Sequence, residues 1–267
     1  MQRRMSSRIH RFEAVENFRD YGDYATAAGR RLAAGRLLRS AHYARATDAD
    51  LRKLLDLGVG VIVDLRHPHE RLRQPSRRPA GWAGTVIESD ICQDENGEPP
   101  HVTFLRTTDL SEASVTRYMT DAYRRIPFEA RHLDLFRRYF EALAEGDGAV
   151  VIHCAAGKDR TGLLAALTHH LAGVSRDDLV EDYLLTNTAV DMAARGPEVA
   201  RRLEELYGKR ATPAAVEAFL GVRPEFLETA FAEIAARYGS LDGYLAEAVG
   251  IGAALRDRVA MRLLGEA

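Results

Sequence analysis

The segment GAVVIHCAAGKDRTGLLAALTHHLAG, residues 148–173, decides the fold of this chain. It begins with an apolar run over 148–154, which is typical of a strand buried in a parallel sheet. It ends with an apolar helical pattern over 161–173, which Gly173 terminates. Between the two, the chain must turn sharply within HCAAGKDRTG, residues 153–162. A buried strand followed at once by a helix predicts an α/β fold.

The segments before this unit continue the alternation of strands and helices. Turns and short strands are expected over 16–43, a helix capped by Thr47, strands over 58–66 and 85–90, a polar loop over 90–101, and amphipathic helices over 111–125 and 130–146. Strands that are joined through helices in this order pair in parallel. We therefore predict a central, mostly parallel sheet that is flanked by helices.

The chain after residue 175 is expected to be a helical complement, 175–267, to that sheet. Helices are predicted over about 176–188, 197–207, 212–219, 224–238 and within 241–264. Pro197, Pro213 and Pro224 stand where three of these helices would begin, a position that proline favours. No linker, repeat or shift in composition divides the sequence, so we expect one domain over 1–267.

Charge and hydropathy exclude several classes of protein. The chain has 37 basic and 39 acidic residues, a formal net charge of −2, which argues against a nucleic-acid partner bound through global charge. No apolar run approaches the roughly 18 residues that a membrane span needs, and the first residues lack the apolar stretch of a secretory signal. We expect a cytoplasmic protein with no integral membrane segment, and signal-independent secretion stays open.

The turn over 153–162 has the properties of an anion-binding loop. A loop that leads into a helix N-terminus directs backbone N–H groups inward and adds the positive end of the helix dipole. Gly157 permits the backbone conformation that such a nest requires. The residues predicted to bind phosphate are Ala155, Ala156, Gly157, Lys158, Thr161 and Gly162.

Cys154 stands at the base of this loop, where the same field favours a thiolate over a thiol. A thiolate below a phosphate cradle is a nucleophile for phosphorus. Arg160 can offer two parallel N–H donors to the phosphoryl oxygens, and Thr161 can hydrogen-bond the departing thiolate. A buried, inert cysteine is the alternative for Cys154, but it leaves the spacing to Arg160 unexplained. We expect His153 to orient the loop by hydrogen bonds rather than to transfer protons.

The loop resembles the signature of the cysteine-dependent protein tyrosine phosphatases. Its KDRTG ending is similar to that of the atypical bacterial members, typified by a mycobacterial enzyme. Further blocks look like that family's in the same order: NFRD (17–20), GRLLRSAHY (35–43), VDLRHPHE (63–70), TRYMTDAYRRIP (116–127), DYLLTN (182–187), GVRPEFL and YGSLDGYL. The resemblance implies the phosphatase fold, a helical lid at about 106–146, and a two-step reaction through a thiophosphate on Cys154 with no metal and no cofactor.

The resemblance also implies a general acid that protonates the leaving phenolate. Asp159 lies inside the loop, Asp90 falls close to the family's second aspartate, and Asp94 is the nearest alternative to Asp90. Each of these aspartates could instead be a solvated loop carboxylate. Cys92 raises one further idea, a protective disulfide with Cys154, against the alternative of a semi-buried bystander.

Lys158 bears on the range of substrates. A flexible point charge beside the cradle suits ligands with several phosphates, such as phosphoinositides, whereas the alternative is a solvated surface charge. The sequence therefore predicts a phosphatase that acts on phosphotyrosine, with phosphoserine, phosphothreonine and phosphoinositides as further candidates. The rival hypothesis is a catalytically silent module that binds phosphorylated ligands. The oligomeric state is not predicted.

Overall fold

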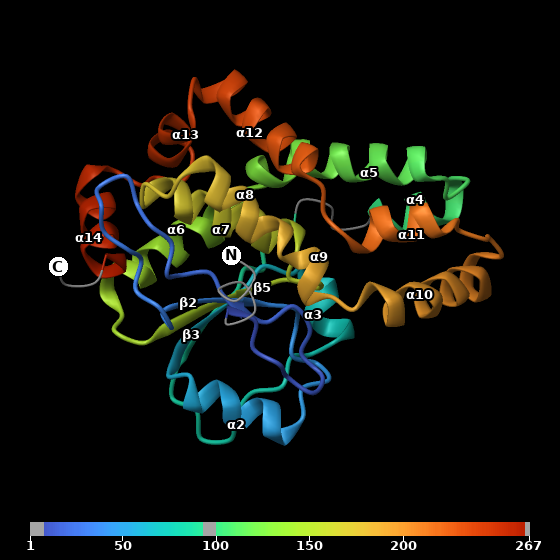
Figure 1. Ribbon diagram of the computed structural model, residues 1–267, viewed down its shortest axis with the longest axis horizontal. Coiled ribbons are helices and arrows are strands. Elements are labelled where there is room, and N and C mark those ends of the chain that lie inside the picture. Colours follow the sequence, from blue (N-terminus) through green and yellow to red (C-terminus); the bar gives the residue numbers. More distant parts are fainter. Residues whose placement is uncertain (1–7, 93–99, 265–267) are drawn as a thin grey trace.

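The centre of the molecule is a five-stranded sheet, seen in a computed structural model that describes residues 8–92 and 100–264 (Figure 1). The strands lie in the order β1 (Arg19–Asp20), β2 (Leu37–Ser40), β5 (Ala149–His153), β3 (Val59–Asp64) and β4 (Thr85–Ile87). β1 is antiparallel to β2, and the other neighbouring strands are parallel. The prediction of a mostly parallel α/β sheet is confirmed.

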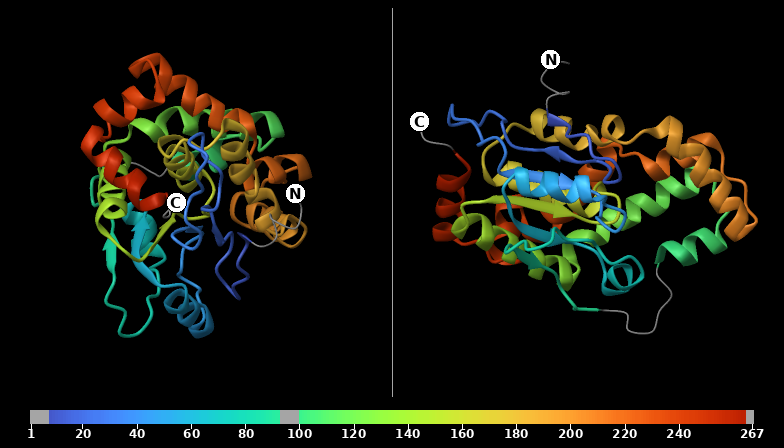
Figure 2. Two further views of the ribbon diagram at one scale, coloured as in Figure 1. Left: turned by 60° about the vertical axis from the view of Figure 1, so that its left-hand side comes forward. Right: turned by 90° about the horizontal axis from the view of Figure 1, so that it is seen from below.

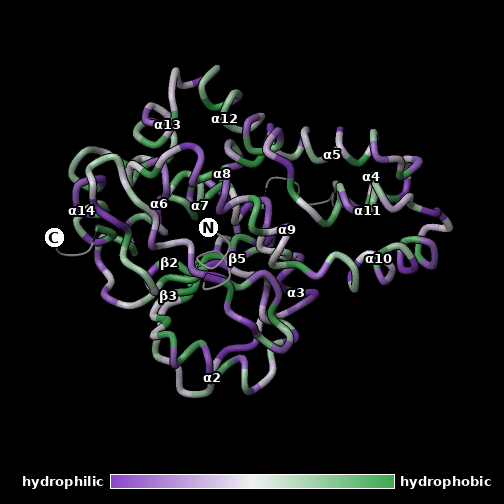
Figure 3. Tube along the Cα trace, in the orientation of Figure 1, coloured by the Kyte–Doolittle hydropathy of each residue, from purple (hydrophilic) through white to green (hydrophobic). Residues whose placement is uncertain are grey.

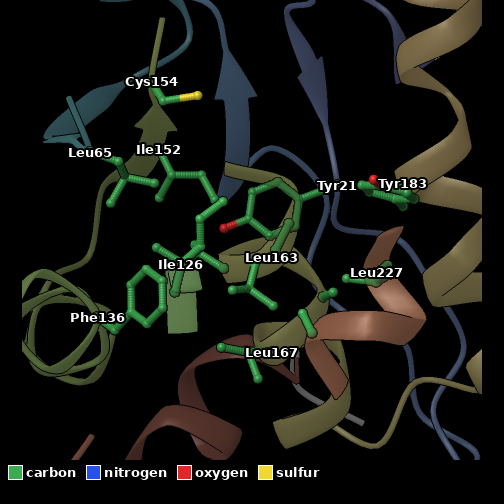
Figure 4. Packing of buried hydrophobic residues seen from close by; sticks show 14 of the residues in the cluster. Tyr21, Leu65, Ile126, Phe136, Ile152, Cys154, Leu163, Leu167, Tyr183 and Leu227 are labelled. Atoms are coloured by element: carbon green, nitrogen blue, oxygen red, sulfur yellow. The ribbon is translucent and has the colours of Figure 1, made fainter. Parts of the chain in front are cut away.

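The side chains of β5 alternate between two apolar cores. Val150 and Ile152 pack into the larger core, on the face covered by α6 (Ala130–Glu145) and α7 (Asp159–Leu171). Figure 4 shows Ile152 in this core beside residues of α6 and α7. Ala149 and Val151 face the smaller core, which α2 (Asp48–Asp56) and the segment before β1 cover. Both faces of β5 are therefore buried, and the hydropathy trace of Figure 3 shows the central strands as the apolar middle of the fold.

The helix α2 (Asp48–Asp56) begins where the sequence places it. Thr47 is its N-cap, and its hydroxyl accepts a hydrogen bond from the backbone N–H of Asp50 at 3.2 Å. The carboxylate of Asp50 accepts one from the N–H of Thr47 at 3.1 Å, which completes a capping box. The helix ends just before Gly58, whose φ of +66° favours glycine.

Helices make up the C-terminal part, as predicted. They are α8 (Arg176–Leu184), α9 (Thr186–Ala189), α10 (Met192–Tyr207), α11 (Pro213–Leu220), α12 (Pro224–Tyr238), α13 (Leu241–Glu247) and α14 (Ala253–Leu263). Pro213 and Pro224 begin α11 and α12 as expected, but the prediction for Pro197 is wrong, because Pro197 lies inside α10. Asp191 caps that helix earlier, since its carboxylate accepts a hydrogen bond from the N–H of Ala194 at 3.0 Å.

The two helices expected over 111–125 and 130–146 have different positions. α5 (Glu112–Arg125) packs against α11 and α12, and together with α10 and α4 (Pro100–Thr107) it extends to one side of the sheet (Figures 1 and 2). α6 instead lies against the sheet and is buried along most of its length. Both helices contribute to the cavity described below, α5 with several side chains and α6 with His132, and a lid role for 106–146 stays a prediction.

Two short helices were not expected from the sequence, α3 (Pro68–Arg73) and α4. α4 begins at the end of the stretch predicted to be a polar loop. No helix within the described ranges is long and apolar enough to cross a membrane.

Candidate active site

The predicted anion-binding loop joins the carboxyl end of β5 to the N-terminus of α7. Cys154 is the first residue after β5, beyond Ile152 at the end of the apolar core (Figure 4). Its side chain is buried and its thiol is free, so the structure contains no disulfide between Cys154 and the exposed Cys92. A parallel sheet places ligand sites at the carboxyl ends of its strands, and the loop has this position.

Gly157 is required in the loop for two reasons. Its φ is +67°, a backbone conformation that favours glycine. In addition, a Cβ atom at this position would lie 2.3 Å from the carbonyl carbon and oxygen of Ser40. The loop therefore packs directly against the end of β2, and the predicted role of Gly157 in shaping it is consistent with this geometry.

The block NFRD, residues 17–20, supports the loop through hydrogen bonds to its backbone carbonyl groups. The side-chain amide of Asn17 donates hydrogen bonds to the carbonyl oxygens of Ala156 at 3.1 Å and Gly157 at 2.9 Å. Arg39 also donates to the Gly157 carbonyl, at 3.1 Å. Because the carbonyl and the N–H of a planar peptide point in opposite directions, these bonds turn the N–H groups of Gly157 and Lys158 away from Asn17.

A buried carboxylate, Asp182 on α8, anchors this support. It accepts from Arg19 at 3.3 Å and from Arg39 at 2.6 Å, and all three side chains are almost fully buried. Burial alone would raise the pKa of Asp182, but the two guanidinium groups outweigh burial and lower it to about 2. Arg19 also hydrogen-bonds the side-chain oxygen of Asn17. The loop thus rests on a charged network that links it to α8.

Glu70 on α3 forms a bidentate ion pair with Arg160. The two terminal nitrogens of Arg160 donate to the two carboxylate oxygens of Glu70, at 2.5 Å and 2.9 Å. Burial would raise the pKa of Glu70, but the positive charge of Arg160 outweighs burial and lowers it, so the carboxylate stays ionised. Sequence reasoning did not assign a role to Glu70. The one sequence feature that could have pointed to Glu70 is its place in the VDLRHPHE block, which resembles a block of the family.

A cavity of about 350 Å³ lies over the loop. One wall is apolar, with Met119, Ala122 and Ile126 on one side and Phe219 and Leu220 of α11 on the other. The polar residues that line it are Arg125, Cys154, Lys158, Asp159 and Arg160, with Glu70, Glu129 and several histidines. The cavity therefore brings the predicted nucleophile, the predicted arginine and one candidate acid together beside an apolar surface.

Of the two candidate acids that the structure describes, Asp159 lines this cavity and Asp90 does not. The Oδ1 of Asp159 accepts a hydrogen bond from the hydroxyl of Tyr123 at 3.0 Å and lies 3.7 Å from the Nζ of Lys158. The highly exposed side chain of Asp90 forms an ion pair with Arg71. Asp94 lies outside the described residues.

Lys158 is one of the residues that line the cavity, and its contact with substrate stays a prediction. Its side chain is buried, and its ammonium group donates to the carbonyl oxygens of Phe219 at 2.5 Å and Gly221 at 3.1 Å. Lys158 is therefore not a solvated surface charge. It ties the loop to the end of α11 while it lines the cavity, and its ammonium group faces the carboxyl group of Asp159 at 3.7 Å.

His153 and Thr161 are buried beside the loop. The Nδ1 of His153 lies 3.4 Å from the carbonyl oxygen of Cys154, and its Nε2 lies 3.6 Å from a carboxylate oxygen of Asp64. Burial lowers the pKa of His153 to about 4, so the imidazole is neutral near pH 7. The Thr161 hydroxyl makes no hydrogen bond within the described residues, so the predicted bond to Cys154 is not formed.

The remaining predicted loop residues have structural roles. Ala155 accepts a hydrogen bond from the N–H of His42 at 3.3 Å. Gly162 allows α8 to approach, since a Cβ there would lie 2.9 Å from the ring of Tyr183. In the described part of the chain, no group of three or more histidine, cysteine, aspartate or glutamate side chains is arranged to hold a metal ion.

Comparisons with known proteins agree with this geometry. The sequence profile described as the tyrosine phosphatase family matches residues 10–265. The triple specificity protein phosphatase PtpB of Mycobacterium tuberculosis is 36% identical over 278 aligned residues, which cover 93% of this chain and 96% of that protein. A putative tyrosine-protein phosphatase of Cupriavidus necator, H16_A0669, is 33% identical over 243 residues, which cover 89% and 83%. Among solved structures, the core catalytic domain of the PP-IP phosphatase SIW14 from S. cerevisiae matches 78% of this chain and 89% of that chain, at 15% identity and a TM-score of 0.30.

Proposed function

Because this chain belongs to the tyrosine phosphatase family, we propose that it hydrolyses phosphotyrosine in two steps, through a phosphocysteine on Cys154. The observation that carries the proposal is the meeting of Cys154, Arg160 and Asp159 in one cavity above an anion-binding loop. The rival, a silent phosphate-binding module, would need only the loop and Arg160.

Substrate binding uses both halves of the cavity. The aromatic ring of the substrate lies against the apolar wall formed by Met119, Ile126 and Phe219. The phosphate lies over the loop, where backbone N–H groups and the N-terminus of α7 attract a dianion. Glu70 occupies the edge of Arg160 formed by its two terminal nitrogens, so the edge formed by Nε and one terminal nitrogen remains for two phosphate oxygens.

The first step transfers the phosphoryl group to sulfur. Cys154 Sγ attacks phosphorus as a thiolate, the S–P bond forms, and the bond from phosphorus to the aryl oxygen breaks. Asp159 gives its proton to that oxygen, so a neutral phenol leaves. Arg160 and the loop N–H groups hold the charge of the equatorial oxygens while the bonds exchange.

The second step frees the enzyme. A water molecule attacks phosphorus and loses a proton to the carboxylate of Asp159. The S–P bond breaks, Cys154 leaves as a thiolate, and inorganic phosphate is released. The Thr161 hydroxyl, which has no partner within the described residues, is available to donate a hydrogen bond to the thiolate at this point. Asp159 is again protonated, so the cycle closes on the chain's own groups and water.

The proposal extends to substrates other than phosphotyrosine. The relative from M. tuberculosis is named a triple specificity phosphatase, and two further cations, Lys158 and the exposed Arg125, line the cavity of this chain. Additional phosphates on the ligand would find positive charge there. We therefore propose phosphoserine, phosphothreonine and phosphoinositides as further substrates. The expected cytoplasmic location and the expected absence of a nucleic-acid partner stay predictions.

The test compares the wild type with Cys154→Ser in a buffer that contains a chelator. We expect the wild type to release phosphate from p-nitrophenyl phosphate, and the variant to release none while it still binds inorganic phosphate in calorimetry. Turnover by the variant would contradict the nucleophile. A wild type that binds phosphate but releases none would favour the binding module.

A further inference from the structure

Two buried tyrosines form a hydrogen-bonded chain that ends on Asp159. The hydroxyl of Tyr183 lies 2.7 Å from the hydroxyl of Tyr123, and the hydroxyl of Tyr123 donates to Asp159 Oδ1 at 3.0 Å. Tyr183 belongs to α8, Tyr123 to α5 and Asp159 to the first turn of α7, so the chain of hydrogen bonds joins three helices. Both rings are fully buried, and Figure 4 shows Tyr183 at the edge of the apolar core.

The direction of the protons in this chain follows from valence. A phenol has one proton, and Tyr123 uses its proton for Asp159. The contact between the two tyrosines must then be a donation from Tyr183 to Tyr123. Burial, followed by the nearby charge of Asp159, raises the pKa of both phenols well above 10, so neither loses its proton at neutral pH. The order of donation is therefore Tyr183 to Tyr123 to Asp159.

Both contacts of Asp159 fall on the same oxygen. Tyr123 donates to Oδ1, and the Lys158 ammonium lies 3.7 Å from Oδ1. An oxygen that accepts a proton donor and faces a cation is the carbonyl oxygen of a neutral carboxylic acid, not its hydroxyl. When Asp159 is protonated, its proton must therefore reside on Oδ2.

We propose that Tyr123 is a positioning residue, which selects Oδ2 as the proton-bearing oxygen of Asp159 and holds the carboxyl plane for transfer to the leaving group. Tyr183 fixes the hydroxyl of Tyr123 in turn. The inference rests on the proposed role of Asp159 as the general acid. Without Tyr123, the carboxyl group can rotate and can place its proton on either oxygen, so a smaller fraction of molecules is ready to protonate the leaving phenolate.

The test is the dependence of the Tyr123→Phe variant on the leaving group. Phenylalanine keeps the buried ring and removes only the hydroxyl. We expect kcat/KM to fall about tenfold for phenyl phosphate, whose phenolate needs a proton, as suits the loss of one hydrogen bond. For 2,4-dinitrophenyl phosphate, whose leaving group needs no proton, we expect a fall of less than about twofold.

Tyr139→Phe is the matched control. Tyr139 is a buried tyrosine of α6 in a chain of the same kind, with its hydroxyl 2.7 Å from that of Tyr21 and 2.9 Å from that of Thr168. Like Tyr123→Phe, this substitution removes one buried hydroxyl, but Tyr139 does not line the cavity. Both substrates should therefore be hydrolysed at the wild-type rate. Equal losses on both substrates in Tyr123→Phe would contradict the inference and indicate a merely structural role.

A double substitution separates this inference from the proposed function. In the background of Asp159→Asn, the change Tyr123→Phe should have no further effect on phenyl phosphate, since Tyr123 acts through Asp159. A further tenfold loss would overturn the inference. If Asp159→Asn alone shows no dependence on the leaving group, the acid is assigned wrongly, and the proposed function fails at that residue. If Asp159→Asn shows the dependence and Tyr123→Phe does not, only the inference fails.

Discussion

Arg160 and Glu70 lie 90 positions apart in the sequence and meet through two parallel hydrogen bonds, of 2.5 Å and 2.9 Å. This pair occupies the edge of the guanidinium formed by its two terminal nitrogens, and leaves the edge that contains Nε for the phosphate of the proposed reaction. It also joins α3 to the start of α7, so the arginine is held before the substrate arrives. A preorganised donor stabilises developing charge without reorganisation during the reaction.

The first prediction concerns that pair. In Glu70→Gln the amide can accept only through one oxygen and carries no charge, so Arg160 loses its fixed orientation. We expect kcat/KM for p-nitrophenyl phosphate to fall by about ten- to a hundredfold, from the loss of a charged hydrogen bond. Steady-state kinetics check this. The control is Glu204→Gln, which breaks an exposed ion pair with Arg210 and should leave the rate unchanged.

Gly157 supports a second prediction. Gly157→Ala would place a methyl group 2.3 Å from the Ser40 carbonyl, so the loop or β2 must shift. We expect phosphate binding to be lost in calorimetry of the Cys154→Ser protein. Gly208→Ala is the matched control, because Gly208 has a similar φ of +65° but open space around it. That control should cost about 1 kcal/mol of stability and no phosphate affinity. Equal affinity in both variants would contradict the close-packed loop.

Lys158 supports a third prediction. Its ammonium is bound by two carbonyl oxygens, so its charge still acts on the cavity. In Lys158→Met we expect kcat/KM to fall further for a phosphoinositide than for a phosphotyrosine peptide, since additional phosphates feel the missing charge. Parallel assays on both substrates give the ratio. Equal losses would mean that Lys158 serves only to tie the loop to α11.

A fourth prediction concerns stability at low pH. In the folded protein burial opposes ionisation, but Arg19 and Arg39 outweigh it and lower the pKa of Asp182 to about 2, from an ordinary value of 3.8 in the unfolded chain. The unfolded chain therefore binds the proton first, and stability falls as the pH decreases from about 4 to 2. Asp182→Asn should remove this part of the acid dependence. Chemical denaturation at pH 3 and pH 7 would test it.

The same substitution should also lower stability at neutral pH. Without the carboxylate, Arg19 and Arg39 are buried with no counter-charge, which costs about 3–5 kcal/mol. A variant that is as stable as the wild type at pH 7 and loses stability in acid just as steeply would contradict the account of this network.

The central unit of the fold could be predicted from the sequence because its signals are local. The apolar run, the turn and the helix over 148–173 each depend on neighbouring residues, and the loop chemistry follows from their order. The helix cap at Thr47 could be predicted for the same reason, since a cap depends only on the residues next to it. The family resemblance added the two-step chemistry, which no pattern of polarity contains.

Two supporting residues, Glu70 and Tyr123, could not be predicted, because they act across the fold. Glu70 reaches Arg160, and Tyr123 reaches Asp159, only after distant helices pack together. Asp90 was expected at the end of a strand over 85–90, but that strand ends at Ile87, and the side chain of Asp90 pairs with Arg71. The prediction that a helix begins at Pro197 was wrong for another reason. Asp191 caps α10 six residues earlier, so Pro197 lies inside the helix.

The most direct test of the account is to trap the covalent intermediate. The protein would be mixed rapidly with an aryl phosphate, quenched in acid and digested, and the peptides analysed by mass spectrometry. We predict a single phosphoryl group on the peptide that contains Cys154, and none in Cys154→Ser. Phosphate release at the wild-type rate with no phosphoryl group on Cys154, or with the group on another residue, would contradict the account.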